Sequence, residues 1–259
     1  MAFFNVFFRT IGFLLAITIF ILLINILFYF YPNNNGIFRH VDGNVNSDNI
    51  ISEIELNGPI VSNISENILG SVIQFIDPEK VNKYLKELKS IKPKILLINI
   101  NSPGGTVSDS AYLEKIINNY KKNNNVKVYF YSSQILASGG YWAATSADRI
   151  FANYGSIIGS IGVSGPSWFY YDNPVSISDG ILGKKMETKN GIKIFDQTAG
   201  KSKDLYNPFR EPTKVELDHL QRLVEEIYDD FILKVSQSRN IEADTIKNDI
   251  GALIYTSKQ

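Results

Sequence analysis

An uncharged apolar run near the N-terminus constrains this chain more than any other feature. From Thr10 to Tyr31 the sequence reads "TIGFLLAITIFILLINILFYFY", and Asn25 is its one amide. As a helix rising 1.5 Å per residue, the run would reach about 33 Å, enough to cross a bilayer core of about 30 Å. A cleaved signal peptide would have a shorter run followed by small residues, whereas aromatic residues that resemble an interfacial belt end this one. The sequence therefore predicts an N-terminal stub and an uncleaved transmembrane anchor over residues 1–31.

A polar segment separates this anchor from the rest of the chain. Residues 32–49 read "PNNNGIFRHVDGNVNSDN", rich in asparagine and poor in apolar residues, which predicts a flexible tether. His40 lies within it and is expected to be solvated. Arg9 and Arg39 flank the apolar run on opposite sides, so charge alone gives no orientation in the membrane.

Beyond the tether, segments with strand and helix patterns alternate. Predicted strands are "IISEIEL" (50–56), "KILLINI" (94–100) and "VKVYFYS" (126–132); predicted helices cover 78–91, 107–122 and 213–239. "KILLINI" is a continuous apolar run, typical of a strand buried on both faces. Alternating strands and helices indicate an α/β domain with a largely parallel sheet over residues 50–259.

Composition excludes several classes of function. The 26 basic and 26 acidic residues are interspersed, so no basic footprint for nucleic acid is present. Cysteine is absent, which excludes a cysteine nucleophile, disulfides and thiolate metal sites. Of the two histidines, His40 lies in the tether and His219 is expected to be a structural, buried residue of the last helix. A Ser-His-Asp triad is therefore not expected, and no metal is predicted.

Two glycine-bearing turns follow two of the predicted strands. "NSPGG" follows "KILLINI", and "ASGG" follows "VKVYFYS". Sites in parallel α/β sheets form beyond the carboxyl ends of the strands, so both turns fall where a site is expected. Ser138 at the head of a helix is a candidate nucleophile, and two unshielded backbone N–H groups would form an oxyanion hole.

A serine needs a base, and without a suitable histidine a lysine can serve if desolvation keeps it neutral. Spacing alone does not choose among the lysines that follow the serine. These are Lys184, Lys185, Lys189, Lys193, Lys201 and Lys203.

Three strings together resemble the signal peptide peptidase A family, membrane-bound Ser/Lys peptidases with the Clp protease/crotonase fold. They are "INSPGGTVSDSAYL", "ASGGYWAATSADRIFANYGSIIGSIGV" and "GKSKDLYNPFREPT". The resemblance covers about residues 50–259, and it implies repeated β-β-α units after a single transmembrane helix. Relative to the family pattern, the segment from Gly162 to Lys203 is long, and the chain stops before a further helix and strand.

The resemblance also implies a role for each matching residue. Ser138 would be the nucleophile and Lys203, in "GKSKD", the general base. The backbone N–H groups of Gly105 and Gly139 would hold the oxyanion, and Ser160, in "GSIGV", would orient the lysine. No cofactor is implied.

Location, partners and substrates follow from the same resemblance. It implies a single-pass protein of the inner or plasma membrane that contacts lipid through its N-terminal helix, with residues 50–259 on the extracytoplasmic (periplasmic) side. It further implies a homo-oligomeric ring, in which Lys203 would serve a neighbour's Ser138, and substrates that are remnant signal peptides or other hydrophobic peptides. Two alternatives stay open: a crotonase-like acyl-CoA enzyme on the same fold, and a catalytically inactive membrane-anchored scaffold.

Overall fold

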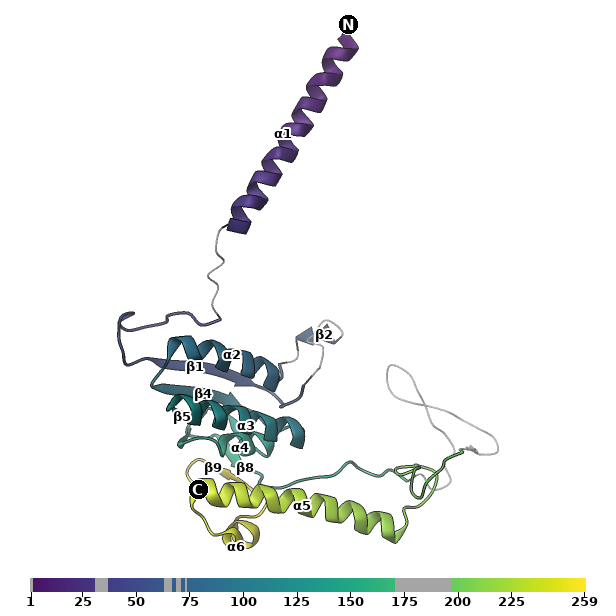
Figure 1. Ribbon diagram of the computed structural model, residues 1–259. Coiled ribbons are helices and arrows are strands. Elements are labelled where there is room, and N and C mark those ends of the chain that lie inside the picture. The colour runs from purple at the N-terminus through teal and green to yellow at the C-terminus, as the bar shows by residue number, and fades with distance from the viewer. Residues whose placement is uncertain (1, 31–36, 63–66, 69–70, 73, 171–196) are drawn as a thin grey trace. The chain divides into compact units, whose positions relative to one another are not determined.

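The computed structural model describes residues 2–30, 37–62, 67–68, 71–72, 74–170 and 197–259 (Figure 1). Contacts divide the chain into two compact units, Met1–Ser47 and Asp48–Gln259. The last residue of the predicted anchor, Tyr31, and the first part of the predicted tether, residues 32–36, lie outside the described residues.

The first unit is built on one long helix, α1 (Ala2–Phe30). Its described side chains are exposed, and two of its polar ones bond to the helix backbone: Thr10 Oγ1 donates to Val6 O at 2.9 Å and Asn25 Nδ2 to Ile21 O at 2.9 Å. Such internal pairing is what a hydrocarbon environment requires of polar groups. By length and composition, Phe4–Ile26 could cross a membrane, although a signal sequence would pass the same test.

The second unit carries the remaining helices and strands. In chain order they are β1 (Ile51–Asn57), β2 (Asn67–Ile68), β3 (Ser71–Val72), α2 (Pro78–Ile91), β4 (Ile95–Asn101), α3 (Val107–Asn124), β5 (Lys127–Ser132), β6 (Ile135–Ala137), α4 (Gly139–Ala144), β7 (Arg149–Ala152), β8 (Ile157–Gly159), α5 (Lys214–Arg239), α6 (Ala243–Thr245), the π-helical turn η1 (Ile246–Ile250) and β9 (Ile254–Thr256). The strands and helices expected from periodicity are all present, and their ends agree to within one or two residues.

A four-stranded parallel sheet in the order β1-β4-β5-β7 forms the centre of this unit. The chain adds its strands one after another toward the same edge of the sheet. Right-handed connections between them therefore place α2, α3 and α4 on one face. Burial alternates along β4, with Leu96, Ile98 and Ile100 fully buried and the residues between them half-buried. The expectation that this strand is buried on both faces is therefore only partly met, because helices cover one face of the sheet.

A second layer of short strands lies beyond the carboxyl ends of the sheet. β6 pairs in parallel with β8, and β8 pairs antiparallel with β9. Single parallel bridges continue the pattern, between Ser102 and Leu136 and between Ile60 and Gly105. Each main strand is thus followed by a short second strand or bridge before its helix, which is the β-β-α repeat that the resemblance implies.

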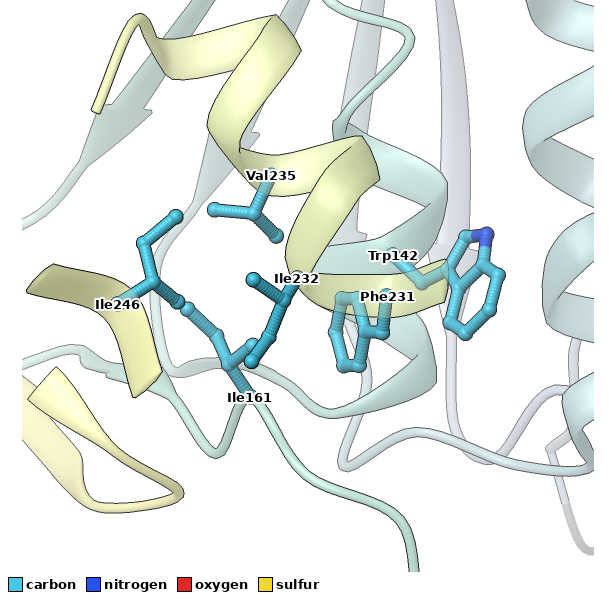
Figure 2. Close-up of a cluster of buried hydrophobic side chains, with 6 residues drawn as sticks. All are labelled: Trp142, Ile161, Phe231, Ile232, Val235 and Ile246. Carbon is cyan, nitrogen blue, oxygen red and sulfur yellow. The ribbon is translucent and has the colours of Figure 1, made fainter. Parts of the chain in front are cut away.

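The long helix α5 begins with a capping box, in which Thr213 and Glu216 bond to each other's backbone N–H. Its C-terminal half packs into an apolar cluster of Trp142, Ile161, Phe231, Ile232, Val235 and Ile246 (Figure 2). The side chains of its N-terminal half are largely exposed. Val215 and Leu223 lie on the apolar stripe of the helix, a pattern typical of a core or a subunit contact, and are 58% and 44% exposed. His219 is also exposed, so the prediction of a buried structural histidine is wrong.

Candidate active site

The turn after β4 and the strand β6 are joined directly. Ser102 N–H donates to Ile135 O at 2.8 Å, and Ala137 N–H donates to Ser102 O at 3.0 Å. The Asn101 side chain secures the approach to β6, because its Oδ1 accepts from the backbone N–H groups of Ser133 and Gln134 at 3.1 and 2.9 Å. These bonds bring the two glycine-bearing turns of the sequence side by side.

Ser138 stands between β6 and α4 in an unusual backbone conformation, with φ 52° and ψ −124°. A positive φ on a non-glycine residue costs free energy, and such strain tends to gather at functional sites. The Ser138 N–H is held by Gly159 O at 2.9 Å, and the hydroxyl makes no capping bond to α4. The strained turn therefore holds the half-buried hydroxyl free of the helix that follows.

The turn after β4 approaches this serine so closely that side chains are excluded. A Cβ on Gly104 would lie 2.9 Å from Gly139 N, and a Cβ on Gly139 would lie 3.1 Å from Gly105 N. The N–H groups of Gly105 and Gly139 make no backbone hydrogen bond recorded for the described part of the chain. Gly139 begins α4, where helix N–H groups have no acceptor of their own. Two free donors from separate turns are thus brought close together beside Ser138.

Hydrogen bonds from the segment after β1 fix the turn after β4. Ile60 N–H donates to Gly104 O at 2.8 Å, and Asp109 of α3 accepts from Ser62 Oγ at 2.6 Å and from Thr106 Oγ1 at 2.8 Å. Burial raises the pKa of Asp109, but these hydrogen bonds outweigh it and leave the pKa below its ordinary value. Asp109 therefore stays ionised and ties the turn to the start of α3.

A cavity of about 270 Å³ opens at Ser138. Trp142 and Phe231 give it an aromatic wall, with ring centroids 4.7 Å apart (Figure 2). Its lining residues are Gly105, Val107, Ser110, Ser138, Gly139, Trp142, Ser160, Gly162, Val163, Ser164, Phe231 and Ala252. The structure thus brings together four of the five residues singled out from the sequence, namely Ser138, Gly105, Gly139 and Ser160.

The fifth residue, Lys203, is elsewhere. It is exposed in the turn before α5, where its backbone N–H donates to Gly200 O at 3.2 Å, and no lysine is among the described residues that line the cavity. Lys201 is exposed in the same turn, while Lys184, Lys185, Lys189 and Lys193 lie outside the described residues.

A network of charges holds the segment that carries Lys203. Arg210 donates to Asp204 Oδ2 at 2.6 Å and to both oxygens of Glu216 at 2.8 and 2.9 Å, and its guanidinium lies 5.3 Å from the centre of the Trp168 ring. The Arg210 hydrogen bonds lower the pKa of Asp204 and of Glu216, and the two carboxylates raise that of Arg210. The turn is therefore fixed from within, without contact with the cavity.

Ser110 was not singled out from the sequence. It is fully buried on α3, lines the cavity, and its Oγ has no hydrogen-bond partner among the described residues. One signal was available: Ser110 is four residues after Thr106, so it lies on the face of α3 that looks toward the glycine turn.

The fold and this cavity define a class of protein: a parallel α/β domain with a free serine hydroxyl and paired glycine N–H groups beyond the ends of its strands. Residues 120–259 match the model of peptidase family S49. Because the match covers more than half of the chain, the chain belongs to this family. The resemblance to signal peptide peptidase A is confirmed.

Several curated proteins similar to this chain agree with this assignment. A "Putative protease" of Methanocaldococcus jannaschii is 37% identical over 57% of this chain and 43% of its own length. A "Putative signal peptide peptidase SppA" of Enterococcus faecium is 28% identical over 89% and 62%, and a "Putative protease" of Synechocystis sp. is 30% identical over 81% and 65%. The chain thus spans between 43% and 65% of the length of each of these relatives. Solved structures similar to it include a ClpP1 mutant from Listeria monocytogenes, with 14% identity, coverage of 80% of this chain and 83% of that one, and a TM-score of 0.46.

Proposed function

We propose that this chain is a membrane-anchored serine endopeptidase in which Ser138 is the nucleophile and Lys203 the general base. The observation that carries the proposal is the conformation of Ser138. Its strained backbone holds a hydroxyl without a capping bond beside two free N–H groups, at the mouth of a cavity. A strained turn that exposes a serine at the head of a helix is the arrangement of nucleophile elbows.

The reaction follows from these positions. Ser138 Oγ would attack the carbonyl carbon of a peptide bond, its proton would pass to the neutral amine of Lys203, and the carbonyl electrons would move onto the oxygen. The Gly105 and Gly139 N–H groups would bind that oxyanion, and losing one such donor typically slows a reaction by about 10²–10³-fold. Collapse of the intermediate would break the C–N bond as the lysine returns the proton to the leaving amine, and water would then release the acyl group.

Lys203 would act on the Ser138 of a neighbouring copy. Two observations support this: the described lining of the cavity holds no lysine, and an internal charge network fixes the turn that presents Lys203 to solvent. Ser160 lines the same cavity in a backbone conformation with φ 51°, where its hydroxyl could bond to an incoming amine. A ring of copies would supply each cavity with the base that it lacks.

The substrate class follows from the lining and the anchor. Trp142, Phe231 and Val163 offer an apolar surface to one side chain of a peptide, and α1 would keep the enzyme at the membrane. Remnant signal peptides and other hydrophobic peptides fit both features. We propose an extracytoplasmic position for the second unit, in keeping with this substrate source.

Labelling with a fluorophosphonate probe tests the nucleophile. The full-length wild-type protein in detergent should react covalently, Ser138→Ala should not, and Ser90→Ala, an exposed serine of α2, should react like the wild type. Labelling that survives in Ser138→Ala would contradict the proposal. If no serine-dependent labelling or peptide hydrolysis occurs in the wild type, the scaffold alternative would replace it.

Mixing variants tests the shared base. Ser138→Ala and Lys203→Ala should each be inactive alone. Copies mixed at random in a ring should regain about a quarter of wild-type hydrolysis, because intact serines then meet intact lysines of neighbours. Lys201→Ala, from the same exposed turn, should keep wild-type activity. A mixture that stays inactive, although the copies exchange, would mean that Lys203 does not serve a neighbour.

A further inference from the structure

One buried hydroxyl in the cavity wall has no partner. Ser110 is 0% exposed, and its Oγ makes no hydrogen bond with any described residue. The other serines of 2% exposure or less are all satisfied: they are Ser102, Ser132, Ser146 and Ser156. An unsatisfied buried hydroxyl destabilises the folded protein, so such a group calls for an explanation.

The helix offers this hydroxyl an easy partner that it does not take. Serine and threonine within helices commonly bond to the carbonyl four residues earlier, as Thr10 does with Val6 O in α1. For Ser110 that carbonyl belongs to Thr106, which accepts the Ser110 N–H at 3.0 Å but not its Oγ. The side chain therefore points away from its own helix backbone and into the cavity wall.

The hydroxyl lies against the residue that follows the proposed nucleophile. A Cβ on Gly139 would overlap Ser110 Oγ and would lie 3.1 Å from Gly105 N. The position of this Cβ is thus adjacent both to the Ser110 hydroxyl and to the free N–H of Gly105. Gly139 itself carries the other free N–H. Ser110 approaches the proposed oxyanion site from α3, whereas the N–H groups come from the turn after β4 and from the start of α4.

We propose that Ser110 is a third hydrogen-bond donor to the substrate oxygen at this site, an inference that rests on the proposed function. The oxygen of a tetrahedral intermediate has lone pairs for three donors. Ser110 Oγ is covered by Gly139 before the reaction, so the substrate oxygen would become its first acceptor among the described residues once Gly139 shifts slightly to admit it. The interaction would arise as charge develops, and it would favour the transition state over the bound substrate.

Substituting Ser110 separates this role from packing. Ser110→Ala removes the donor and leaves the volume almost unchanged. We expect kcat of the full-length enzyme on a hydrophobic peptide to fall about 10²-fold, with KM little changed. Inhibition by a peptide aldehyde, which forms a tetrahedral adduct, should weaken by a similar factor. The melting temperature should stay the same or rise, because an unsatisfied hydroxyl is removed.

Two further variants sharpen the test. Ser110→Cys keeps the shape with a weaker donor, so its kcat should fall between those of the wild type and Ser110→Ala. Ser146→Ala is the matched control: its buried Oγ donates to Ala143 O at 2.7 Å, outside the cavity lining. This control should melt at a lower temperature and keep its kcat.

The outcomes distinguish the inference from the proposed function. Wild-type kcat in Ser110→Ala, while hydrolysis still depends on Ser138, would overturn the inference alone. Equal losses of kcat in Ser110→Ala and Ser110→Cys, together with a lower melting temperature, would show that Ser110 acts through packing. This result would also overturn the inference. An absence of Ser138-dependent hydrolysis in the wild type would overturn both.

Discussion

Gly104 lies directly against Ser138: a Cβ on Gly104 would be 2.8 Å from Ser138 Cβ and 3.0 Å from its Oγ. Glycine is therefore required here for two reasons, the contact and a backbone φ of 112°. The turn after β4 thus reaches the hydroxyl only because it lacks a side chain.

Gly104→Ala should reduce hydrolysis and fluorophosphonate labelling by at least about 10²-fold, because small misplacements at a reacting centre cost that much. Gly155→Ala is the control for backbone strain, since Gly155 has φ 83° with open space where its Cβ would lie. It should lose stability and keep its activity. Equal activities of the two variants would show that the contact with Ser138 is unimportant.

Acid should destabilise the network around Arg210. Hydrogen bonds from Arg210 chiefly, and from the Thr213 backbone, hold the pKa of Glu216 well below its ordinary value. The unfolded chain takes up that proton near its ordinary pKa of about 4.3, before the folded chain does. The stabilisation is therefore present above about pH 5 and is lost as the pH falls through 4 toward the lowered pKa of the folded state.

Melting temperatures measured from pH 7 to pH 3 check this expectation. The wild type should lose stability below about pH 5, whereas Glu216→Gln should be less stable at pH 7 and should change less with pH. Glu211→Gln, an exposed glutamate, should follow the wild type. A wild type and a Glu216→Gln variant with parallel pH profiles would place the acid sensitivity elsewhere.

The sequence predicts the main sheet and its helices because each of these elements is long enough to show a period. The short strands β6, β8 and β9 have three residues each, too few for any pattern. They form through pairings between distant segments, such as Ser102 with Leu136. Periodicity also shows which face of α5 is apolar but not what covers it: Val215 lies on that face and is 58% exposed.

The residues of the candidate site also differ in how far the sequence predicts their positions. Ser138, Gly105 and Gly139 could be placed together because parallel strands end at one edge of a sheet. The position of Lys203 depends on the packing of a turn far along the chain, which no local pattern specifies. Ser110 resembles the polar positions of an amphipathic helix, and its burial follows from the contact of α3 with Gly139.

Phe231 links the stability of the domain to the shape of the cavity. It is 1% exposed, stacks on Trp142 in the apolar cluster and also lines the cavity (Figure 2). Phe231→Ala should lower the free energy of unfolding by about 3–5 kcal/mol. It should also widen the cavity and move the cleavage preference toward bulkier side chains. Phe231→Leu should show both effects more weakly, and unchanged stability in Phe231→Ala would contradict the packing described here.

Asn101 holds the turn that leads to β6, so it should influence Ser138 without touching it. Its Oδ1 accepts from the backbone N–H groups of Ser133 and Gln134 and from the hydroxyls of Ser132 and Ser133. Three of these four hydrogen bonds are partly buried, and removing an acceptor for such donors costs about 1–3 kcal/mol.

Asn101→Ala should therefore lose about that much stability in urea unfolding, and kcat should fall because Ser138 is less firmly held. Asn101→Asp keeps the acceptor and should retain most of both. Asn99→Ala, two residues earlier on β4, removes a side chain whose amide bonds only to Glu53 among the described residues, and should preserve kcat. If Asn101→Ala lost stability but kept the wild-type kcat, the turn would tolerate movement, and the position of Ser138 would not depend on Asn101.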